Sequence, residues 1–424
     1  MRLICGPFEF ALPGEDGDLR IILYGQPGTE GRGSAGDAAR GELLHRRLEA
    51  APMAWDLLSI ALSVVAADFA VLRDQSPDGW TREMSLDVAV ANPVFWNGQA
   101  AALVDALAFL TTDRWVLRFH AGGMAPPPLP EPVRPTEDCI VLLSGGLDSL
   151  VGAIDIATRG LKALAISQTV RGDAEKQVAF ASSIGAGLTH LQLNHNARVP
   201  GIEETSQRAR SLIFIAFGVL AATSLRRYHE GESVPLYVCE NGFIAINPPL
   251  TGGRLGSLST RTAHPEFLSR LQEILDDAGL RVGIDNPYGA RTKGEMLRHC
   301  ANQPLLETEA VRSTSCGRFQ RFNYQHCGRC VPCQVRRAAF IAWGVPDTTA
   351  YVYEQLGRKD SDHAGFDDVR SVAMALADVE AGGLDAWLWK GLTVARVSDR
   401  EALKAMVGRA LDELGVLHRV HGVQ

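Results

Sequence analysis

Two short segments of the chain hold residue types that could do chemistry. The first is Ser-Gly-Gly-Leu-Asp-Ser at residues 144–149, which follows the apolar run CIVLL and precedes another apolar pattern. The second, at residues 316–333, holds four of the eight cysteines of the chain. Glycines and hydroxyl groups between a strand and a helix are typical of an anion site, and clustered cysteines are typical of a metal site.

The segment at 144–149 is predicted to lie where a buried strand ends and a helix begins. Backbone N–H groups and the helix dipole can hold an anion there, and the two glycines let the main chain approach a phosphate without a Cβ atom in the way. The two serines can add hydroxyl donors. We interpret the segment as a loop that holds the pyrophosphate of ATP, with Asp148 contacting a Mg²⁺ ion that offsets its charge.

This loop lacks the lysine of the pattern G-x-x-x-x-G-K-[ST], so the phosphate geometry of that motif is not implied. Cleavage between the α and β phosphates of ATP fits the loop better. The alternative interpretation is an ordinary glycine-containing turn between a strand and a helix.

The cysteines at 316–333 have the spacing C-x10-C-x2-C-x2-C, which predicts a closed tetrahedral zinc site. Four thiolates leave no open position for water, so the zinc is expected to be structural. Buried free thiols are the alternative. His326 could compete as a ligand, but we expect it to face solvent or to lie beside the site. The expected ligands are Cys316, Cys327, Cys330 and Cys333.

The surroundings of these cysteines are basic, with six arginines and no Asp or Glu between Val311 and Val345. Guanidinium groups can stabilise a zinc tetrathiolate and can also face phosphates, whereas a plain basic surface is the alternative. The four other cysteines are expected to be buried small apolar residues: Cys5, Cys139, Cys239 and Cys300.

The elements that must position these residues alternate between strands and helices from Asp138 onward. Apolar runs such as CIVLLS, LKALAISQ and LTHLQLNH read as strands, and the stretches between them read as helices. Alternation of this kind predicts an α/β fold with a parallel sheet and helices on both faces. Ligands of such sheets bind beyond the carboxyl ends of the strands.

The rest of the chain divides around MAPPPLPEPVRP, which has six prolines in twelve positions and is predicted to be an extended linker. Before it we expect an accessory α+β domain, in which AWDLLSIALSVVAADFAV is either a helix or a buried strand. The predicted parts are an accessory domain at 1–123, the linker at 124–135, an ATPase domain with the zinc site at 136–351 and a helical extension at 352–424.

Composition favours a globular cytoplasmic protein. The formal net charge of -7 makes nucleic acid an unlikely main partner. We find no stretch that approaches the roughly 18 apolar residues of a membrane span, and the first residues lack the apolar core of a secretory signal.

The loop at 144–149 resembles that of the PP-loop ATP pyrophosphatase superfamily, which uses S-G-G-x-D-S to activate a substrate as its adenylate. Together with SCG, CGRCVPCQVRRAAF and GVPDTTAY, it resembles the 7-cyano-7-deazaguanine synthase (QueC) family. That family has S-C, then C-G-x-C-x-x-C-x-x-R and a trailing G-[IV]-x-D-x-T-x-Y. The resemblance covers residues 139–351, about half of the chain.

The resemblance implies ATP, Mg²⁺ and Zn²⁺ as cofactors and assigns further residues. TKGEML matches the K-x-E segment of the family and contains Lys293, and Arg210 stands where the family has an arginine. Asp148, Lys293 and Arg210 are our candidate catalytic residues, since charge that builds on the α-phosphate needs cations aimed at it. The residues assigned to the nucleotide are Ser144, Gly145, Gly146, Leu147, Asp148, Ser149 and, near the adenosine, Gln168.

The chain also departs from the family. QueC proteins are about half as long, and their substrate segment Y-P-D-C-R is replaced here by ENGFIAINPPLTGGRLGSLSTRTAHPEF, in which Gly252, Gly253 and Gly256 are expected in a mobile loop. Long proteins with this layout resemble the QueC-like component of the Qat anti-phage defence operons. That resemblance implies that a deazaguanine carboxylate is joined to a protein amine.

The leading hypothesis is therefore an ATP-dependent ligase that adenylates 7-carboxy-7-deazaguanine and transfers it to an amine of a partner protein encoded in the same operon. Three alternatives stay open: a 7-cyano-7-deazaguanine synthase that uses ammonia, a tRNA thiolation enzyme and a non-catalytic ATP-sensing module. Thiolation would require a reactive cysteine outside the zinc site, either Cys239 or Cys300.

Overall fold

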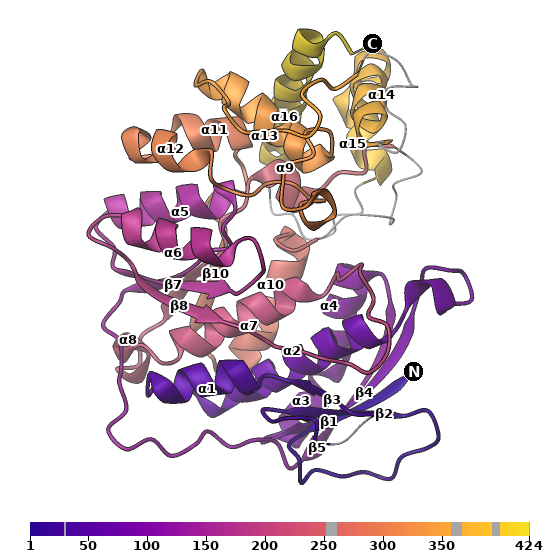
Figure 1. The fold of residues 1–424 in the computed structure, drawn as a ribbon, viewed down its shortest axis with the longest axis vertical. Coiled ribbons are helices and arrows are strands. Elements are labelled where there is room, and N and C mark those ends of the chain that lie inside the picture. The colour runs from indigo at the N-terminus through magenta and orange to yellow at the C-terminus, as the bar shows by residue number, and fades with distance from the viewer. Residues whose placement is uncertain (29–30, 252–260, 358–366, 392–398, 424) are drawn as a thin grey trace.

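The computed structural model describes residues 1–28, 31–251, 261–357, 367–391 and 399–423. Within these residues the chain forms two five-stranded sheets with helices between them (Figure 1). The strands are β1 Arg2–Gly6, β2 Leu19–Leu23, β3 Gly33–Ala35, β4 Glu83–Val90, β5 Arg114–Ala121, β6 Cys139–Leu142, β7 Ala163–Gln168, β8 Thr189–Leu193, β9 Val234–Tyr237 and β10 Val282–Asp285.

The helices in the first part of the chain are α1 Asp37–His45, α2 Pro52–Ala70, the 3-10 turn Arg73–Gln75, α3 Pro93–Gly98 and α4 Ala100–Thr111. Those around the second sheet are α5 Leu147–Thr158, α6 Ala174–Ser183, α7 Arg210–Ala222, α8 Arg226–His229, α9 Gly242–Ile246 and α10 Pro265–Asp277. Those that follow it are α11 Lys293–Arg298, α12 Gln303–Ala310, the 3-10 turn Gln320–Phe322, α13 Val331–Trp343, α14 Asp367–Gly382, α15 Leu384–Gly391 and α16 Arg400–His421.

The second sheet has the strand order β10-β9-β6-β7-β8, with every pairing parallel. Successive side chains of a strand point to opposite faces, and β6 buries both. Ile140 and Leu142 join a core with α7 and α10, whereas Val141 and Leu143 join another core with α5 and α6. The predicted α/β class, a parallel sheet with helices on both faces, is confirmed.

The first sheet has the order β3-β2-β1-β4-β5, and its strands also run parallel. The accessory region was expected to be α+β. It does mix helices and strands, but a parallel sheet joined through helices makes α/β the better description. The sequence of this region holds no signal for the relative direction of its strands.

Helix α2 lies between the two sheets beside α7 and α10 (Figure 1). Its apolar residues belong to one continuous core with the first sheet, α7 and the inner face of the second sheet. The helix is 19 residues long with a mean hydropathy of 1.6, enough to span a membrane by length and composition, so the expectation that no stretch approaches that length was wrong. Almost all of it is buried inside the protein, as in the central helix of a folded core.

A buried ion network ties the end of α2 to the start of α7. The Oδ1 atom of Asp68 lies 2.6 Å from the guanidinium of Arg82, which also lies 2.6 Å from Asp113. The Oδ2 atom of Asp68 accepts hydrogen bonds from the backbone N–H groups of Arg208 and Ala209, each at 2.8 Å. These two residues directly precede α7, so the first region of the chain fixes where that helix begins.

The helices after residue 366 pack onto the second sheet's region and do not form a separate body. Their apolar residues share a core with α9 and α13. The expected helical extension is therefore present and covers the chain segment that follows β9. Gly252, Gly253 and Gly256, for which a loop was expected, lie outside the described residues.

Replacing Asp68 by Ala should destabilise the protein by about 3 kcal/mol, because a buried arginine loses one partner and two backbone donors lose their acceptor. Denaturation in urea measures this change. The matched control is Asp74→Ala, an exposed acid six residues on, which should change the free energy of unfolding by less than about 0.5 kcal/mol. Equal stabilities of the two variants would contradict the role given to the network.

Candidate active site and metal site

The segment 144–149 forms a tight loop between β6 and α5. Gly145 has a φ of +88°, a conformation that favours glycine. The hydroxyl oxygens of Ser144 and Ser149 lie 3.0 Å apart, and the N–H of Gly146 donates to Ser144 Oγ at 3.2 Å. Helix α5 begins at Leu147 without a side-chain cap, so its first N–H groups face the loop and fit an anion.

The neighbouring segment before the cysteines holds this loop in place. The N–H of Thr314 donates to the carbonyl of Gly145 at 3.0 Å, and the Thr314 hydroxyl bonds Lys176 Nζ and Asp173, each at 2.6 Å. Lys176 is thus brought beside the phosphate loop, and no sequence pattern had singled it out. The metal segment and the loop form one local structure.

Asp148, in the first turn of α5, is buried and paired with Lys293. The Lys293 Nζ atom lies 2.5 Å from Asp148 Oδ1, and the side-chain amide of Asn241 donates to Oδ2 at 2.7 Å. Burial alone would raise the pKa of Asp148, but the charge of Lys293 and these hydrogen bonds lower it to about 2. Two residues predicted from separate motifs, 145 positions apart, therefore meet.

Glu240 lies beside this pair and shares a hydrogen bond with Asp148. Burial and the negative charge of Asp148 raise the pKa of Glu240 well above its usual value, against the opposing effects of Lys293 and Arg210. Without a further cation the protonated form of Glu240 is therefore favoured beside Asp148. Two adjacent carboxylates beside a phosphate loop are a donor set that fits Mg²⁺.

The C-terminal helix α16 fixes the position of Lys293, the first residue of α11. Thr292 caps α11 with Glu295 in a capping box. The Thr292 hydroxyl donates to Glu413 at 2.5 Å, and the N–H of Gly294 donates to the same carboxylate at 3.3 Å. Arg409 bonds Glu295 at 2.6 Å. The start of α11 is therefore held from both sides.

Arg210, the first residue of α7, is exposed, and no hydrogen bond or ion pair of its side chain is found among the described residues. Surrounding protein nevertheless lowers the pKa of its guanidinium, while Asp173 and Glu240 oppose that effect. The side chain is thus open to a ligand on the same side as the carboxylates. Gln168 ends β7, and its carbonyl accepts from Gln177, which also donates to the carbonyl of Ser144.

The four cysteine sulfurs all lie within 4.8 Å of one another and are buried. Cys316 and Cys330 Sγ are 3.9 Å apart, as are Cys327 and Cys333 Sγ. A tetrahedral zinc ion with Zn–S bonds near 2.3 Å needs sulfurs about 3.8 Å apart, so the donor set fits zinc.

Backbone donors also fit a thiolate cluster. The N–H groups of Arg318 and Cys327 point at Cys316 Sγ at 3.4 Å, and the N–H of Cys330 points at Cys327 Sγ at 3.2 Å. Cys330 caps α13 and Cys333 lies in its first turn, where the helix dipole favours negative charge. The cluster is therefore prepared for anionic sulfur.

His326 is buried beside the cluster, so of the two expected placements the one beside the site is confirmed and the one facing solvent is wrong. Its Nε2 atom accepts the N–H of Ser315 at 3.1 Å. Arg336, one of the six arginines, is fully buried and bonds the Ala310 carbonyl at 2.8 Å and the Thr349 hydroxyl at 2.9 Å, so it binds neither a phosphate nor a thiolate. The other cysteines are buried as expected.

Sequence reasoning missed Glu240 and Asn241, which complete the site around Asp148. They follow β9, the neighbour of β6 in the sheet. The rule that ligands bind beyond the carboxyl ends of parallel strands could have identified them, since the segment PLYVCEN places two polar residues at such an end. The sequence did not show that β9 lies beside β6, because the order of the strands in the sheet is set by tertiary packing.

No family model matches the chain. About half of it is similar to curated proteins named 7-cyano-7-deazaguanine synthase. The protein of Paracoccus denitrificans is 27% identical over 237 residues, 50% of this chain and 92% of the relative. That of Rhizorhabdus wittichii is 28% identical over 242 residues, 50% of this chain and 94% of the relative. That of Sphingopyxis alaskensis is 28% identical over 238 residues, 50% and 97% respectively.

Replacing Cys330 by Ser should lower bound zinc and thermal stability together, because structural zinc stabilises the fold directly. Elemental analysis and thermal melting measure both. The control Cys139→Ser changes a buried thiol outside the cluster and should leave the zinc content unchanged. Purified protein without zinc, whose melting a chelator does not alter, would refute the metal assignment.

Replacing Glu240 by Gln should raise the melting temperature of the free protein above about pH 5. A carboxyl group whose pKa is higher in the folded protein than in the unfolded chain lowers the free energy of unfolding at any pH above its unfolded pKa, which is about 4.3 for Glu. This loss grows with pH until the pH reaches the folded pKa. The gain should vanish near pH 4. Melting curves from pH 4 to 8 test this, with Glu230→Gln, an exposed acid, as control. A gain that does not depend on pH would argue against the raised pKa of Glu240.

Proposed function

We propose that the chain is an ATP-dependent carbon–nitrogen ligase that adenylates a carboxylate, releases pyrophosphate and passes the acyl group to an amine. The observation that supports it best is the arrangement at the carboxyl ends of β6 and β9. There an uncapped helix start meets two carboxylates and a lysine. The similarity to synthases over half of the chain supports the same reaction class.

The residues of this chain would divide the work as follows. The N–H groups at the start of α5 and the hydroxyls of Ser144 and Ser149 bind the pyrophosphate. Asp148 and Glu240 hold Mg²⁺, which supplies positive charge between the phosphates. Lys293 and Arg210 stabilise the charge that develops on the α-phosphate.

The atoms of the proposed reaction balance in two steps. A carboxylate oxygen attacks the α-phosphorus of ATP, and pyrophosphate leaves, which yields an acyl-adenylate. An amine then attacks the acyl carbon, AMP leaves, and the amine releases a proton. Neither step needs a covalent enzyme nucleophile, which agrees with a site built from an anion loop, carboxylates and cations.

The substrate we propose is a deazaguanine carboxylate, 7-carboxy-7-deazaguanine. Support comes from the name of the relatives, which is that of a deazaguanine synthase. For the acceptor we propose an amine of a partner protein encoded beside the gene, as in an anti-phage defence operon. A protein acceptor must be positioned over a larger surface than a small molecule, so this proposal requires a surface on the chain that could dock it.

The outer face of the first sheet offers such a surface. Helices α1, α2, α3 and α4 contribute to the core on the inner face, and among the described residues no helix covers the other side. That side carries Asp87, which bonds Arg2 and Arg118, and the exposed side chain of Val116. The segment between β1 and β2 covers the rest of that face and buries Ile4 and Ile22, so the part that fits a docking role is the exposed strip at β4 and β5 around Val116.

Ammonia is the second candidate acceptor, and it is favoured by the similarity to proteins named 7-cyano-7-deazaguanine synthase. Thiolation is less well supported, because Cys239 and Cys300 are both buried and burial raises the pKa of each thiol, that of Cys300 to about 12. A reactive cysteine needs a lowered pKa and an accessible sulfur. A non-catalytic ATP sensor would bind ATP without releasing pyrophosphate.

The test incubates the full chain with ATP, Mg²⁺ and 7-carboxy-7-deazaguanine, together with either ammonium or the protein encoded beside it. Pyrophosphate release should depend on the acid, and intact-mass analysis should show the deazaguanine acyl group on the partner protein. Asp148→Asn should reduce turnover by at least about 100-fold, since loss of one key electrostatic group typically has that effect. Asparagine keeps the shape of the buried side chain.

The control for that variant is Glu175→Ala, an exposed acid on α6, which should keep full turnover. If the enzyme forms a nitrile from ammonium and the mass of the partner protein does not change, the acceptor is ammonia and the proposed protein acceptor is wrong. ATP binding without pyrophosphate release would refute the ligase. For the defence setting, phage plating on cells with and without the active gene should differ, and equal plating would exclude it.

A further inference from the structure

A pocket lies at the amino ends of the strands of the second sheet, on the edge away from the loop at 144–149. It has a volume of about 390 Å³, within the range of small-molecule sites. Thr189 begins β8, Leu164 lies at the start of β7, and Glu137 precedes β6. The opposite wall comes from Leu48 and Val133 of the first region and the linker. The pocket thus lies at the seam between the first region and the second sheet.

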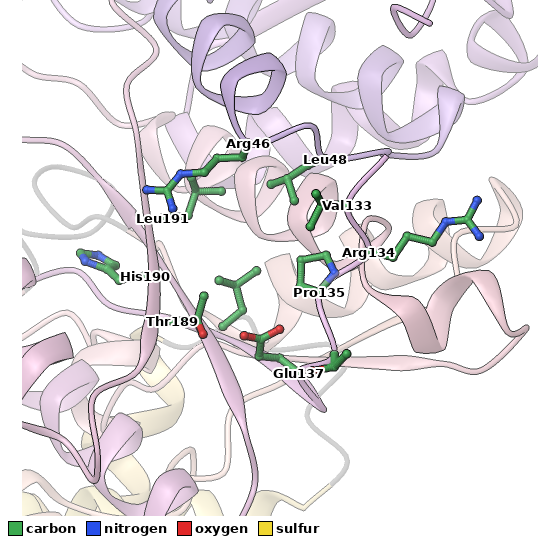
Figure 2. Close-up of a pocket in the computed structure, with 11 residues that line it drawn as sticks. Arg46, Leu48, Val133, Arg134, Pro135, Glu137, Thr189, His190 and Leu191 are labelled. Atoms are coloured by element: carbon green, nitrogen blue, oxygen red, sulfur yellow. The ribbon is translucent and has the colours of Figure 1, made fainter. Parts of the chain in front are cut away.

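Most of the surface area that lines this pocket is apolar, and the polar side chains of the lining are Arg46, Arg134, Thr136, Glu137, Thr189 and His190. Leucine, valine and proline side chains form most of it, and Figure 2 shows the carboxylate of Glu137 near the hydroxyl of Thr189. The Oε2 atom of Glu137 is buried and has no hydrogen-bond donor among the described residues. No hydrogen bond of the Thr189 hydroxyl is found in the described part of the chain either. A buried carboxylate oxygen without a donor therefore lies beside a hydroxyl group that can both donate and accept.

The other charged groups around the pocket are already balanced. Arg46 pairs with Glu42 at 2.9 Å and Arg134 with Glu49 at 2.6 Å. In Figure 2 both guanidinium groups point away from the centre of the pocket. Glu137 is thus left as the uncompensated charge of this lining.

His190 does not supply the missing positive charge. Its Nε2 atom lies 2.8 Å from Ser167 Oγ, which donates its own proton to the carbonyl of Leu143. Burial and the charge of Arg46 lower the pKa of His190 to about 4, so the ring is neutral near pH 7. The lining holds a carboxylate without a cation, and an unpaired carboxylate at a partly buried position is unfavourable.

We propose that this pocket binds a small organic cation, an alkylammonium compound with a compact apolar body, whose ammonium group donates to Glu137 and Thr189. The apolar side chains hold the body of the ligand, and the carboxylate selects its charge. The site does not depend on the proposed ligase activity, because it lies at the other edge of the sheet. A bound ligand would stabilise the contact between the first region and the second sheet.

The test uses three probes of nearly equal shape: 2-phenylethylammonium, the neutral 2-phenylethanol and the anionic 3-phenylpropanoate. Calorimetry with the full chain at constant salt measures their affinities. The cation should bind at least about tenfold more tightly than the neutral probe, the effect of one charge-assisted hydrogen bond. Binding of the neutral probe as tightly as the cation, preference for the anion or no binding of the cation at about 10 mM would overturn the proposal.

Two variants assign the selectivity to the named side chains. Glu137→Gln keeps the shape of the pocket and should weaken the cation at least about tenfold while leaving the neutral probe unchanged. Thr189→Val, at an exposed position, should weaken the cation less. Glu131→Gln, an exposed linker glutamate, is the matched control and should change nothing. Unchanged affinity of the Glu137→Gln variant for the cation would refute the site. Without ligand, this variant should have a melting temperature no lower than that of the unaltered protein.

Discussion

The site is organised by a charge that the fold leaves incompletely balanced. Asp148 and Glu240 lie together among protein atoms, and Lys293 pairs with Asp148 and acts on Glu240 through its charge. Burial and the charge of Asp148 raise the pKa of Glu240 and so favour its protonated form over two adjacent negative charges. A cation brought by a nucleotide would displace that proton. Asp148 belongs both to the segment 144–149 and to the first turn of α5, so the phosphate loop lies next to the two carboxylates. The fold therefore couples the phosphate site to the cation site.

The arrangement depends on chain segments that are distant in the sequence. Asp148 comes from the start of α5, Glu240 from the end of β9 and Lys293 from the start of α11. Each position is a strand or helix end at one edge of the second sheet, where main-chain groups are free to face a ligand. The cysteine cluster fixes the loop from the other side through Thr314. A metal in that cluster would therefore act on the active site only through the position of the loop.

The parts of this structure that the sequence could predict are those with local signals. The glycines at 145 and 146, the spacing of Cys316, Cys327, Cys330 and Cys333 and the alternation of strands and helices were readable because neighbours in sequence determine them. The parallel direction of the first sheet was not readable, since strand patterns are alike in both directions. Glu240 was overlooked because its role depends on β9 lying beside β6, and strand order is a property of tertiary packing. The orphan carboxylate of Glu137 is likewise visible only in three dimensions.

The region before the linker and the C-terminal helices each fix the start of a helix that carries a candidate catalytic cation. Asp68, in the first region, accepts the N–H groups of Arg208 and Ala209, and α7 then begins with Arg210. Glu413, in the last helix, accepts from Thr292 and Gly294, and the residue between them is Lys293. Each candidate catalytic cation thus stands at a helix start that is fixed by a carboxylate from outside the half of the chain that is similar to the synthases.

This relation changes how the size of the chain should be interpreted. An added domain that only docks a partner would leave the catalytic cations supported by the central half alone. Here the central half lacks both carboxylates, and its inner core continues into α2. Positioning of the cations is therefore a property of the whole chain, and the mere presence of the extra regions cannot by itself decide between a protein acceptor and ammonia. What favours docking is a part without such an internal role, the outer face of the first sheet at β4 and β5. There the side chain of Val116 is exposed, and the buried Asp87 holds the charged groups of Arg2 and Arg118 in place beside it.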